Sequence, residues 1–362
     1  SVLNLIMPKR EYSENENRYL SQMPEFSLSS LFAEEDKDKF TTKFESFITD
    51  QFVYRDGWVG MKTEAEKLLQ KRDSGGVYFA EDDYLIEMFD TVDNKQYEKN
   101  IAFLKEFSEK MKSEQGLDVH TMLVPTASYT LSDKLPSHAP EVSQDELLDY
   151  AMEQLPNFVD VRDTLKNHKD EYIYYRTDHH WTSLGVYYVY QQWCQIAGLS
   201  QTALESYSQE VLSSAFYGTT YSKACLYTTP PDTILAFHPA QESDVNVTYQ
   251  SGDKITQTDI LYETSYLATK DKYSVFLNGN QPVTKIATGN HNGRRLLLIK
   301  DSYANAFAPF AAEDYEEVYL IDLRYMKDSL SQFIQENGIN EILVLYNLKG
   351  FSSDNNLYLI TK

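Results

Sequence analysis

The chain has 362 residues, of which 42% are hydrophobic, so it is long enough and apolar enough to bury a substantial core. This length exceeds the usual size of one domain, although α/β enzymes of similar length often form a single body with insertions. The 33 Lys and Arg residues against 55 Asp and Glu residues give a formal net charge of −22, which repels nucleic acid and anionic membrane surfaces. We therefore expect neither as a partner.

The cysteines and the apolar runs exclude further classes of protein. Cys194 and Cys225 are too few for a disulfide framework or a zinc cluster, and whether they pair or remain buried thiols is open. No stretch approaches 18 consecutive apolar residues, so no membrane-spanning helix is predicted. The chain starts at Ser1 with the mostly apolar run 2–7, which leads us to expect a preceding export signal or membrane anchor and hence an extracytoplasmic protein.

The first part of the chain, residues 1–93, predicts an N-terminal helical extension that ends in a hairpin. Apolar residues recur at helical spacing through 36–52 and 59–69. Two short apolar runs, 77–79 and 84–86, are separated by acidic turn residues and predict the two strands of the hairpin.

From residue 94 onward, helix and strand patterns alternate. Residues 97–115 form a predicted amphipathic helix, and residues 119–124 a predicted buried strand. Such alternation predicts an α/β fold in which a doubly wound, mostly parallel sheet carries helices on both faces. The alternation is lost over about residues 200–290, which we interpret as an irregular, β-rich insertion in an α/β domain spanning 94–362.

The predicted insertion contains short strand patterns separated by turn residues. The clearest are 245–249 and 273–277, which are rich in β-branched and aromatic residues. We expect these strands to lie beside the main sheet rather than within it.

Strands and helices alternate again towards the C-terminus. The predicted strands are 296–299, 318–321 and 342–346, and the predicted helices between them are 303–310 and 329–336. Ligands of doubly wound sheets bind beyond the carboxyl ends of the strands. Polar residues follow all three predicted strands at that end: Asp301 and Ser302, Asp322 and Arg324, and Asn347.

Three of the polar residues predict nucleophilic chemistry. Ser302 lies between a strand and a helix, where backbone N–H groups could hold an oxyanion, although an ordinary helix-capping serine is the alternative. His180 and Asp178 stand two residues apart before a predicted helix that Thr182 or Ser183 would cap. A histidine base needs a carboxylate to fix its tautomer and to stabilise the imidazolium. We predict that Ser302, His180 and Asp178 form a catalytic triad, with purely structural histidines as the alternative.

Other residues near these positions have two interpretations each. Asn347 and Arg324 could complete an oxyanion hole or grip substrate, or they could form a turn and a surface ion pair. Trp181, Tyr303 and Tyr325 could form an aromatic platform for sugar rings, or they could pack in the protein like most of the 28 tyrosines.

A metal site at Asp178, His179 and His180 is a competing interpretation. We consider it the weaker one, because adjacent histidines on an extended turn point apart and no other ligand spacing repeats in the chain. We therefore predict no metal ion and no tightly bound cofactor.

The run Asp-His-His-Trp at 178–181, followed by Thr-Ser-Leu-Gly at 182–185, resembles the signature of the DHHW family of bacterial extracytoplasmic proteins. The other blocks of that family resemble stretches spread over nearly the whole chain: 16–18, 50–56, 300–305 and 321–325. The family is similar to the SGNH-hydrolase-like alginate O-acetyltransferases, in which the Asp/His block precedes the Ser block, a circular permutation of the usual order.

The resemblance implies an SGNH-hydrolase-like, flavodoxin-like α/β fold in which Ser302 is the nucleophile, His180 the base and Asp178 the residue that orients it. Asn347 falls where the SGNH asparagine would stand in the permuted order. Two features depart from the hydrolase pattern. Lys300 stands where the hydrolase motif has glycine, and the Asp-to-His spacing is two, as in the acetyltransferase relatives, rather than three.

The predicted function is that of an O-acetyltransferase or acetylesterase acting on a cell-surface or exported polysaccharide. The resemblance implies a membrane-bound acyl-donor protein as a partner, and we expect the chain to be a monomer. The alternative is a non-catalytic polysaccharide-binding or assembly protein that keeps the fold.

Overall fold

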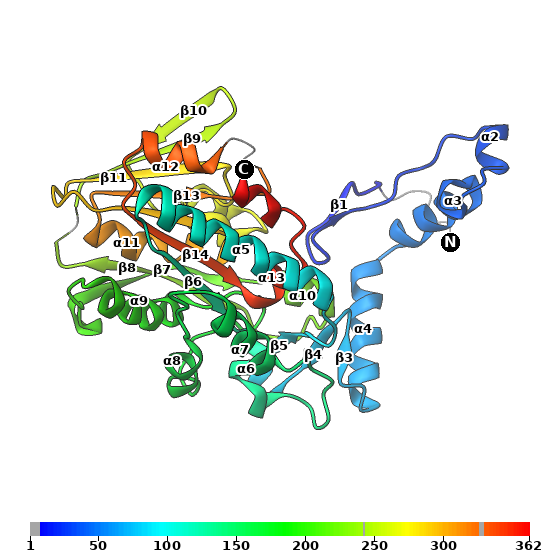
Figure 1. The fold of residues 1–362 in the computed structure, drawn as a ribbon. Helices are drawn as coiled ribbons and strands as arrows, with labels where there is room; N and C mark the ends of the chain where they lie inside the picture. Colours follow the sequence, from blue (N-terminus) through cyan, green and yellow to red (C-terminus); the bar gives the residue numbers. More distant parts are fainter. Residues whose placement is uncertain (1–7, 242, 326–328) are drawn as a thin grey trace.

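The computed structural model describes residues 8–241, 243–325 and 329–362 (Figure 1). Residues 1–7, on which the expected export signal or anchor depends, lie outside the described residues. In the described part of the chain, no helix combines the length and the apolar character that crossing a membrane requires. Cys194 and Cys225 are both free thiols.

Seven strands of the described residues form the central sheet, in the order β10-β9-β11-β13-β12-β14-β6. Its parallel part consists of four neighbouring strands: β6 (Val119–Val124), β14 (Glu341–Asn347), β12 (Arg295–Lys300) and β13 (Glu317–Ile321). These strands coincide with the apolar runs of the sequence. Their parallel pairing confirms the predicted α/β class with a central, largely parallel sheet.

Helices cover both faces of this sheet. Successive strand residues point to opposite faces, so an apolar strand has a hydrophobic surface on each side for helices to cover. In β12, Leu296 and Leu298 belong to one hydrophobic cluster, and Leu297 and Ile299 belong to the other. The covering helices are α5 (Asn94–Gln115), α7 (Gln144–Gln154), α12 (Leu330–Glu336) and α13 (Leu348–Ser353) on one face, and α6 (Ala127–Thr130), α8 (Arg162–Asn167), α9 (Ser183–Ala197) and α11 (Ala308–Asp314) on the other.

The ends of the main helices follow from local side-chain chemistry. The Asp93 carboxylate accepts hydrogen bonds from two backbone N–H groups in the first turn of α5, and Gly116 ends this helix in the left-handed region with φ 70°. The Thr182 hydroxyl accepts a hydrogen bond from Gly185 N and caps α9. Thr182 thereby fixes the point at which the preceding Asp-His-His-Trp run meets a helix.

The segment between α9 and β12 differs from the expectation. Its strands β9 (Val245–Ser251), β10 (Lys254–Thr258) and β11 (Val283–Thr288) do not lie beside the sheet but extend it, since β11 pairs antiparallel with β13. The run 273–277 is not a strand either. Lys272–Val275 forms a 3₁₀ turn, and burial of its aromatic side chains outweighs their β-propensity.

The same segment also contains a separate hairpin and a short helix. The hairpin consists of β7 (Tyr207–Phe216) and β8 (Asp232–Pro239), which pair antiparallel. The helix is α10 (Thr219–Ala224), and it contacts the N-terminal hairpin strands β4 (Val77–Phe79) and β5 (Leu85–Glu87).

The N-terminal segment is helical where its apolar residues have helical spacing. Helices α3 (Phe40–Asp50) and α4 (Arg55–Leu68) occupy the two predicted positions, and α2 (Leu28–Leu31) and α3 project away from the sheet in Figure 1. The predicted hairpin forms as β4 and β5, which pair antiparallel.

Candidate active site

The predicted site residues gather at the carboxyl ends of the parallel strands. Strand β12 ends at Lys300, and Ser302 is the first residue of the 3₁₀ turn Ser302–Asn305 that follows. Strand β14 ends at Asn347 beside it. A cleft of about 440 Å³ opens at this edge and is lined by Ser302, Asn347 and Arg324. A larger cavity of about 780 Å³ lies against β8 and α11, and no predicted site residue is among the described residues that line it.

Ser302, His180 and Asp178 lie in one chain of hydrogen bonds. Ser302 Oγ is 2.7 Å from His180 Nε2, and His180 Nδ1 is 2.5 Å from Asp178 Oδ1. With an ionised carboxylate, this arrangement assigns the proton to Nδ1 and leaves Nε2 as the acceptor for the serine hydroxyl. Asp178 and His180 are both buried, whereas Ser302 lines the cleft.

The loop that carries His180 is held by backbone and side-chain hydrogen bonds. Asp232, at the start of β8, accepts hydrogen bonds from the backbone N–H groups of Arg176 and Thr177 and from the Thr177 hydroxyl. On the other side, the Trp181 indole N–H donates to the carbonyl oxygen of Tyr303 at 3.1 Å. The loop is therefore tied both to the β7–β8 hairpin and to the turn that carries Ser302.

The second oxygen of Asp178 is held by the helix α10. Asp178 Oδ2 accepts hydrogen bonds from Thr219 N at 2.8 Å and Thr219 Oγ1 at 3.1 Å. Burial alone raises the pKa of Asp178, but its electrostatic interactions with the two neighbouring imidazoles and its hydrogen bonds with His180 and Thr219 outweigh burial and hold the pKa well below its ordinary value. The carboxylate is thus ionised, as a partner of an imidazolium must be.

Aromatic rings fix the plane of the His180 imidazole. Tyr273 stacks on it with a centroid distance of 3.7 Å and an interplanar angle of 12°. Burial, followed by the neighbouring His179, lowers the pKa of His180 to about 4, although Asp178 acts in the opposite direction. At neutral pH the imidazole is therefore uncharged and able to accept a proton.

Two groups beside Ser302 can donate hydrogen bonds into the cleft. As the first residue of its 3₁₀ turn, Ser302 has a backbone N–H with no acceptor inside the turn. Asn347 Oδ1 accepts from Lys349 N and Gly350 N at the start of α13, which turns its NH₂ group the other way. Among the described residues, nothing accepts a hydrogen bond from that NH₂ group.

Asp301 links the two strand ends that carry these donors. Its Oδ1 accepts a hydrogen bond from Tyr303 N and its Oδ2 from Asn347 N, both at 2.9 Å. Burial raises the pKa of Asp301 to about 6 despite these hydrogen bonds. From the sequence, Asp301 is only a polar residue at the end of a strand, and its position in space identifies it as the link.

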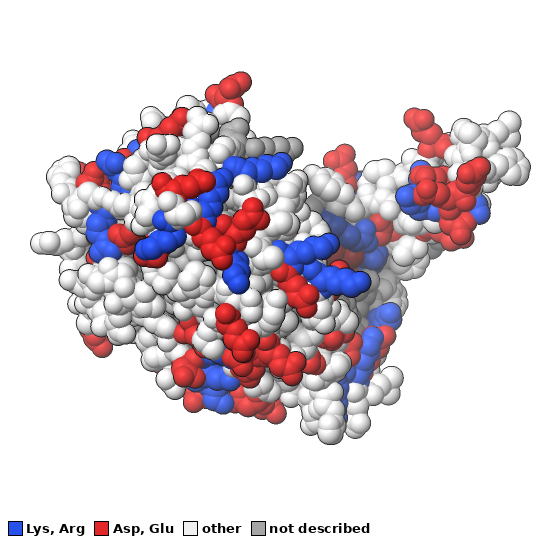
Figure 2. Space-filling model, in the orientation of Figure 1, with Lys and Arg blue, Asp and Glu red and all other residues white. Residues whose placement is uncertain are grey.

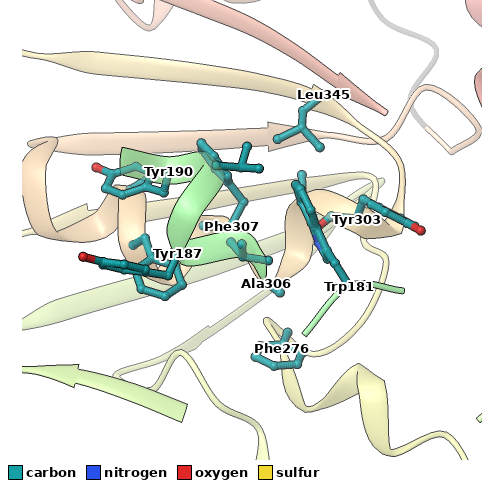
Figure 3. Packing of buried hydrophobic residues seen from close by; sticks show 14 of the residues in the cluster. Trp181, Tyr187, Tyr190, Phe276, Tyr303, Ala306, Phe307 and Leu345 are labelled. Atoms are coloured by element: carbon teal, nitrogen blue, oxygen red, sulfur yellow. The ribbon is translucent and has the colours of Figure 1, made fainter. Parts of the chain in front are cut away.

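The aromatic side chains do not form the platform that the sequence allowed. Trp181 has no exposed surface and packs against Tyr303, with ring centroids 5.2 Å apart (Figure 3). Tyr303 is almost fully buried, and its hydroxyl donates to the His179 carbonyl oxygen. Tyr325 is 54% exposed but is not among the described residues that line the cleft. Trp181 and Tyr303 instead pack inside the protein, which is the other of the two interpretations, and Trp181 cannot contact a sugar because it has no exposed surface.

Arg324 and Lys300, two cations near the cleft, are already occupied. Arg324 Nε and Nη2 donate to the two carboxylate oxygens of Asp322 at 2.8 and 2.5 Å. Lys300 Nζ donates to Asn280 Oδ1 and Asn305 Oδ1 at 2.9 and 2.7 Å, and its side chain is buried. The lysine that replaces the glycine of the hydrolase motif therefore points away from the cleft.

Asp178, His179 and His180 are close enough to hold a metal ion, since their possible ligand atoms all lie within 4.8 Å of one another. The expectation that the two histidines point apart is wrong, because their ring centroids are 3.9 Å apart. Both His180 nitrogens are engaged by Asp178 and Ser302. A metal ion at His180 would have to displace one of these partners.

Comparisons with known proteins identify the family. A sequence model for the DHHW protein family matches residues 70–321, which is more than half of the chain. The crystal structure of a DHHW family protein from Eubacterium siraeum has a TM-score of 0.69 and 30% identity, and the match covers 79% of this chain and 95% of that one. A comparison with curated proteins finds no significant match.

Two more distant structures share the fold. Bacillus cereus PatB1, solved with a sulfonyl adduct, has a TM-score of 0.68 at 24% identity over 79% of this chain and 98% of its own. The O-acetyltransferase domain of Pseudomonas putida AlgJ has a TM-score of 0.50 at 13% identity over 78% of this chain and 94% of its own. The sequence model and the Eubacterium siraeum structure show that the chain belongs to the DHHW protein family.

Proposed function

We propose that this chain is an O-acetyltransferase or acetylesterase that acts on a cell-surface or exported polysaccharide through an acetyl-serine intermediate at Ser302. One observation carries the proposal. Ser302 Oγ lies 2.7 Å from Nε2 of the neutral His180 imidazole, and the other ring nitrogen, Nδ1, lies 2.5 Å from the buried carboxylate of Asp178. A serine hydroxyl becomes a useful nucleophile when a base of this kind can take its proton.

In the first half-reaction, Ser302 Oγ attacks the carbonyl carbon of an acetyl ester while His180 Nε2 takes the hydroxyl proton. Asp178 stabilises the imidazolium through the hydrogen bond at Nδ1. The tetrahedral oxyanion accepts hydrogen bonds from the Ser302 N–H and the Asn347 NH₂ group. When the intermediate collapses, the C–O bond to the donor alcohol breaks, and the alcohol takes the proton from His180.

In the second half-reaction, a hydroxyl group attacks the acetyl-serine. His180 removes the proton of the incoming hydroxyl, and Ser302 leaves with that proton returned to Oγ. A sugar hydroxyl gives acetyl transfer, and water gives hydrolysis. The same groups serve both outcomes, so the acceptor that the cleft binds determines which of them dominates.

The wider assignments of this proposal rest on the family resemblance. We infer an SGNH-hydrolase-like catalytic domain over 94–362, preceded by the extension 1–93, and a location outside the cytoplasm with a membrane-bound acyl donor as partner. The O-acetyltransferase activity named for the AlgJ domain is the reaction class proposed here. At 13% identity, the likeness to AlgJ supports only the fold. The proposed reaction rests on the hydrogen bonds that join Ser302, His180 and Asp178.

The test is hydrolysis of a chromogenic acetyl ester together with labelling by a sulfonyl fluoride, since PatB1 was solved with a sulfonyl adduct. We expect the purified protein to hydrolyse the ester, and Ser302→Ala and His180→Ala to lower kcat at least about a thousandfold. Ser113→Ala is the matched control, because this exposed serine lies on α5 and its hydroxyl bonds only its own helix.

Three outcomes separate the proposal from its rivals. Absence of both hydrolysis and Ser302 labelling would favour a non-catalytic polysaccharide-binding or assembly protein. Activity that a chelator removes and zinc restores would favour a metal hydrolase at Asp178, His179 and His180. Activity that survives chelation and disappears on sulfonylation of Ser302 supports the acyl-serine route.

A further inference from the structure

We propose that the acceptor bound in the cleft beside Ser302 is an uncharged glycan, and not a polyuronate or a phosphate-bearing polymer. This inference rests on the proposed acetyl chemistry and concerns only what binds next to it. Its basis is that the cations of the cleft are already neutralised by carboxylates of the protein, while one carboxylate of the cleft has no cation.

Lys349 is the first of the two Lys and Arg residues that line the described cleft. Its Nζ donates to the carbonyl oxygen of Met88 at 2.6 Å and lies 3.3 Å from Glu87 Oε2. Glu87 also pairs with Lys223 through its other oxygen. A carboxylate or phosphate of a substrate would therefore compete for Lys349 with Glu87, a half-buried carboxylate that is already in place.

Arg324 is the second of these cations, and its guanidinium is also engaged. Arginine recognises carboxylates and phosphates with two parallel N–H donors. The pair formed by Nε and Nη2 is already used by Asp322, which is itself fully buried and whose negative charge neutralises the guanidinium. Exchanging that partner for a ligand would leave Asp322 buried and unpaired, which is costly.

The acidic groups of the cleft add repulsion. Three carboxylates, those of Glu87, Asp301 and Asp354, line the described cleft beside the two cations. The Asp354 carboxylate accepts hydrogen bonds only from Asn356, and no cation among the described residues pairs with it. A polyanion would thus meet a surplus of negative charge within the cleft.

The surroundings reinforce this local balance. The chain has a formal net charge of −22, so its long-range field repels a polyanion at low ionic strength. Figure 2 shows Lys and Arg side chains next to Asp and Glu side chains over most of this face, rather than gathered in a basic patch.

Uncharged hydrogen-bonding groups remain for the acceptor. The amide side chains of Asn355 and Asn356 and the hydroxyl of Ser353 line the cleft beside Asn347, whose NH₂ group is assigned to the oxyanion. Amides and hydroxyls pair with sugar hydroxyls and N-acetyl groups as donors and as acceptors. The cleft therefore matches a neutral sugar chain in polarity as well as in charge.

The experiment compares two O-acetylated oligosaccharides of equal length, a neutral xylo-oligosaccharide and an anionic oligomannuronate. Acetate release is followed at about 20 and about 200 mM salt, between which charge screening changes strongly. We expect kcat/KM to be about tenfold higher for the neutral substrate at low salt. We also expect salt to raise kcat/KM only for the anionic substrate.

A chromogenic acetyl ester run in parallel separates this inference from the proposed function. If neither the small ester nor the oligosaccharides release acetate, the proposed function fails, and the inference fails with it. If the small ester is hydrolysed but the anionic oligosaccharide equals or exceeds the neutral one at low salt, only the inference is overturned. The inference is also overturned if the small ester is hydrolysed and neither glycan is.

A charge variant tests whether the cleft itself selects against anions. Glu87→Gln releases Lys349 and Lys223, so the ratio of anionic to neutral kcat/KM should rise about fivefold. The matched control is Asp253→Asn, which removes an equal charge from the exposed turn between β9 and β10. An equal rise in both variants, or no rise with Glu87→Gln, would show that the cleft does not select its acceptor by charge.

Discussion

Gly218 lies so close to Asp178 that a Cβ atom built on the glycine would be 2.3 Å from both Cβ and Oδ2 of the aspartate. The backbone of Gly218, at φ −86° and ψ −158°, is one that other residues adopt without strain. The glycine is therefore required by space and not by conformation. Without a side chain at Gly218, the start of α10 can approach the Asp178 carboxylate, to which the next residue, Thr219, donates its hydrogen bonds.

Gly218→Ala should displace the Asp178 side chain and with it the His180 ring. We expect kcat for the acetyl ester to fall at least about a hundredfold and the free energy of unfolding to fall by about 1–3 kcal/mol, as for other overpacked sites. Ester kinetics and denaturant unfolding measure the two effects. Gly57→Ala is the control, because no atom lies within 4 Å of its new Cβ. Full activity in Gly218→Ala would contradict the proposed triad geometry.

Thr219→Val tests the hydroxyl that holds Asp178. Valine keeps the shape of the side chain but loses the hydrogen bond that Oγ1 donates to Asp178 Oδ2 and the hydrogen bond between Oγ1 and His179 Nδ1, while the backbone N–H remains. We expect kcat to fall about tenfold with KM nearly unchanged, because the hydroxyl positions the base and Thr219 is not among the described residues that line the cleft. A change confined to KM would argue that Thr219 contacts the substrate instead.

Tyr273 tests whether stacking fixes the imidazole. Tyr273→Phe keeps the ring and loses only a long 3.4 Å hydrogen bond to the Ser302 carbonyl oxygen, so activity should stay within about threefold of the original. Tyr273→Ala removes the ring and leaves a cavity, which should lower kcat by about tenfold to a hundredfold and stability by about 3–5 kcal/mol. Equal activities in the two variants, with both folded, would rule out a positioning role for the ring.

The lowered pKa of His180 predicts the acid limb of the activity. The reaction requires the neutral imidazole, and burial lowers the pKa of His180 from 6.5 to about 4, so the base stays neutral as the pH falls to mildly acidic values. We expect kcat/KM to be level above about pH 6 and to fall only at lower pH. Acetate release measured across this range provides the test, and a half-point at or above the ordinary histidine pKa would contradict it.

Asp301 supplies the control for that profile. Burial raises the pKa of Asp301 to about 6. Protonation of this carboxylate would weaken the hydrogen bond that it accepts from Tyr303 N or from Asn347 N. An acid limb near pH 6 that disappears in Asp301→Asn would therefore report Asp301 and not the base. If Asp301→Asn leaves the fall of kcat/KM at acidic pH unchanged, that fall reports protonation of His180.

The sequence by itself determined the features that depend on local patterns. Apolar runs located the strands β6, β12, β13 and β14, because a strand buried on both faces must be apolar throughout. Helical periodicity and capping residues located α5 and α9. The polar residues that follow parallel strands share one edge of the sheet, so the neighbourhood of Ser302 and Asn347 was also predictable.

Only the tertiary structure decided which groups support that site. Thr219, Tyr273 and Asp232 come from a segment with no clear periodicity, and they contact the site only because the chain folds back on it. The same folding joined β11 to the sheet, placed Trp181 in the core and brought the rings of the two adjacent histidines into contact. Burial and hydrogen bonds between distant residues outweigh local propensity of about 1 kcal/mol or less per residue, and such contacts leave no pattern in the sequence.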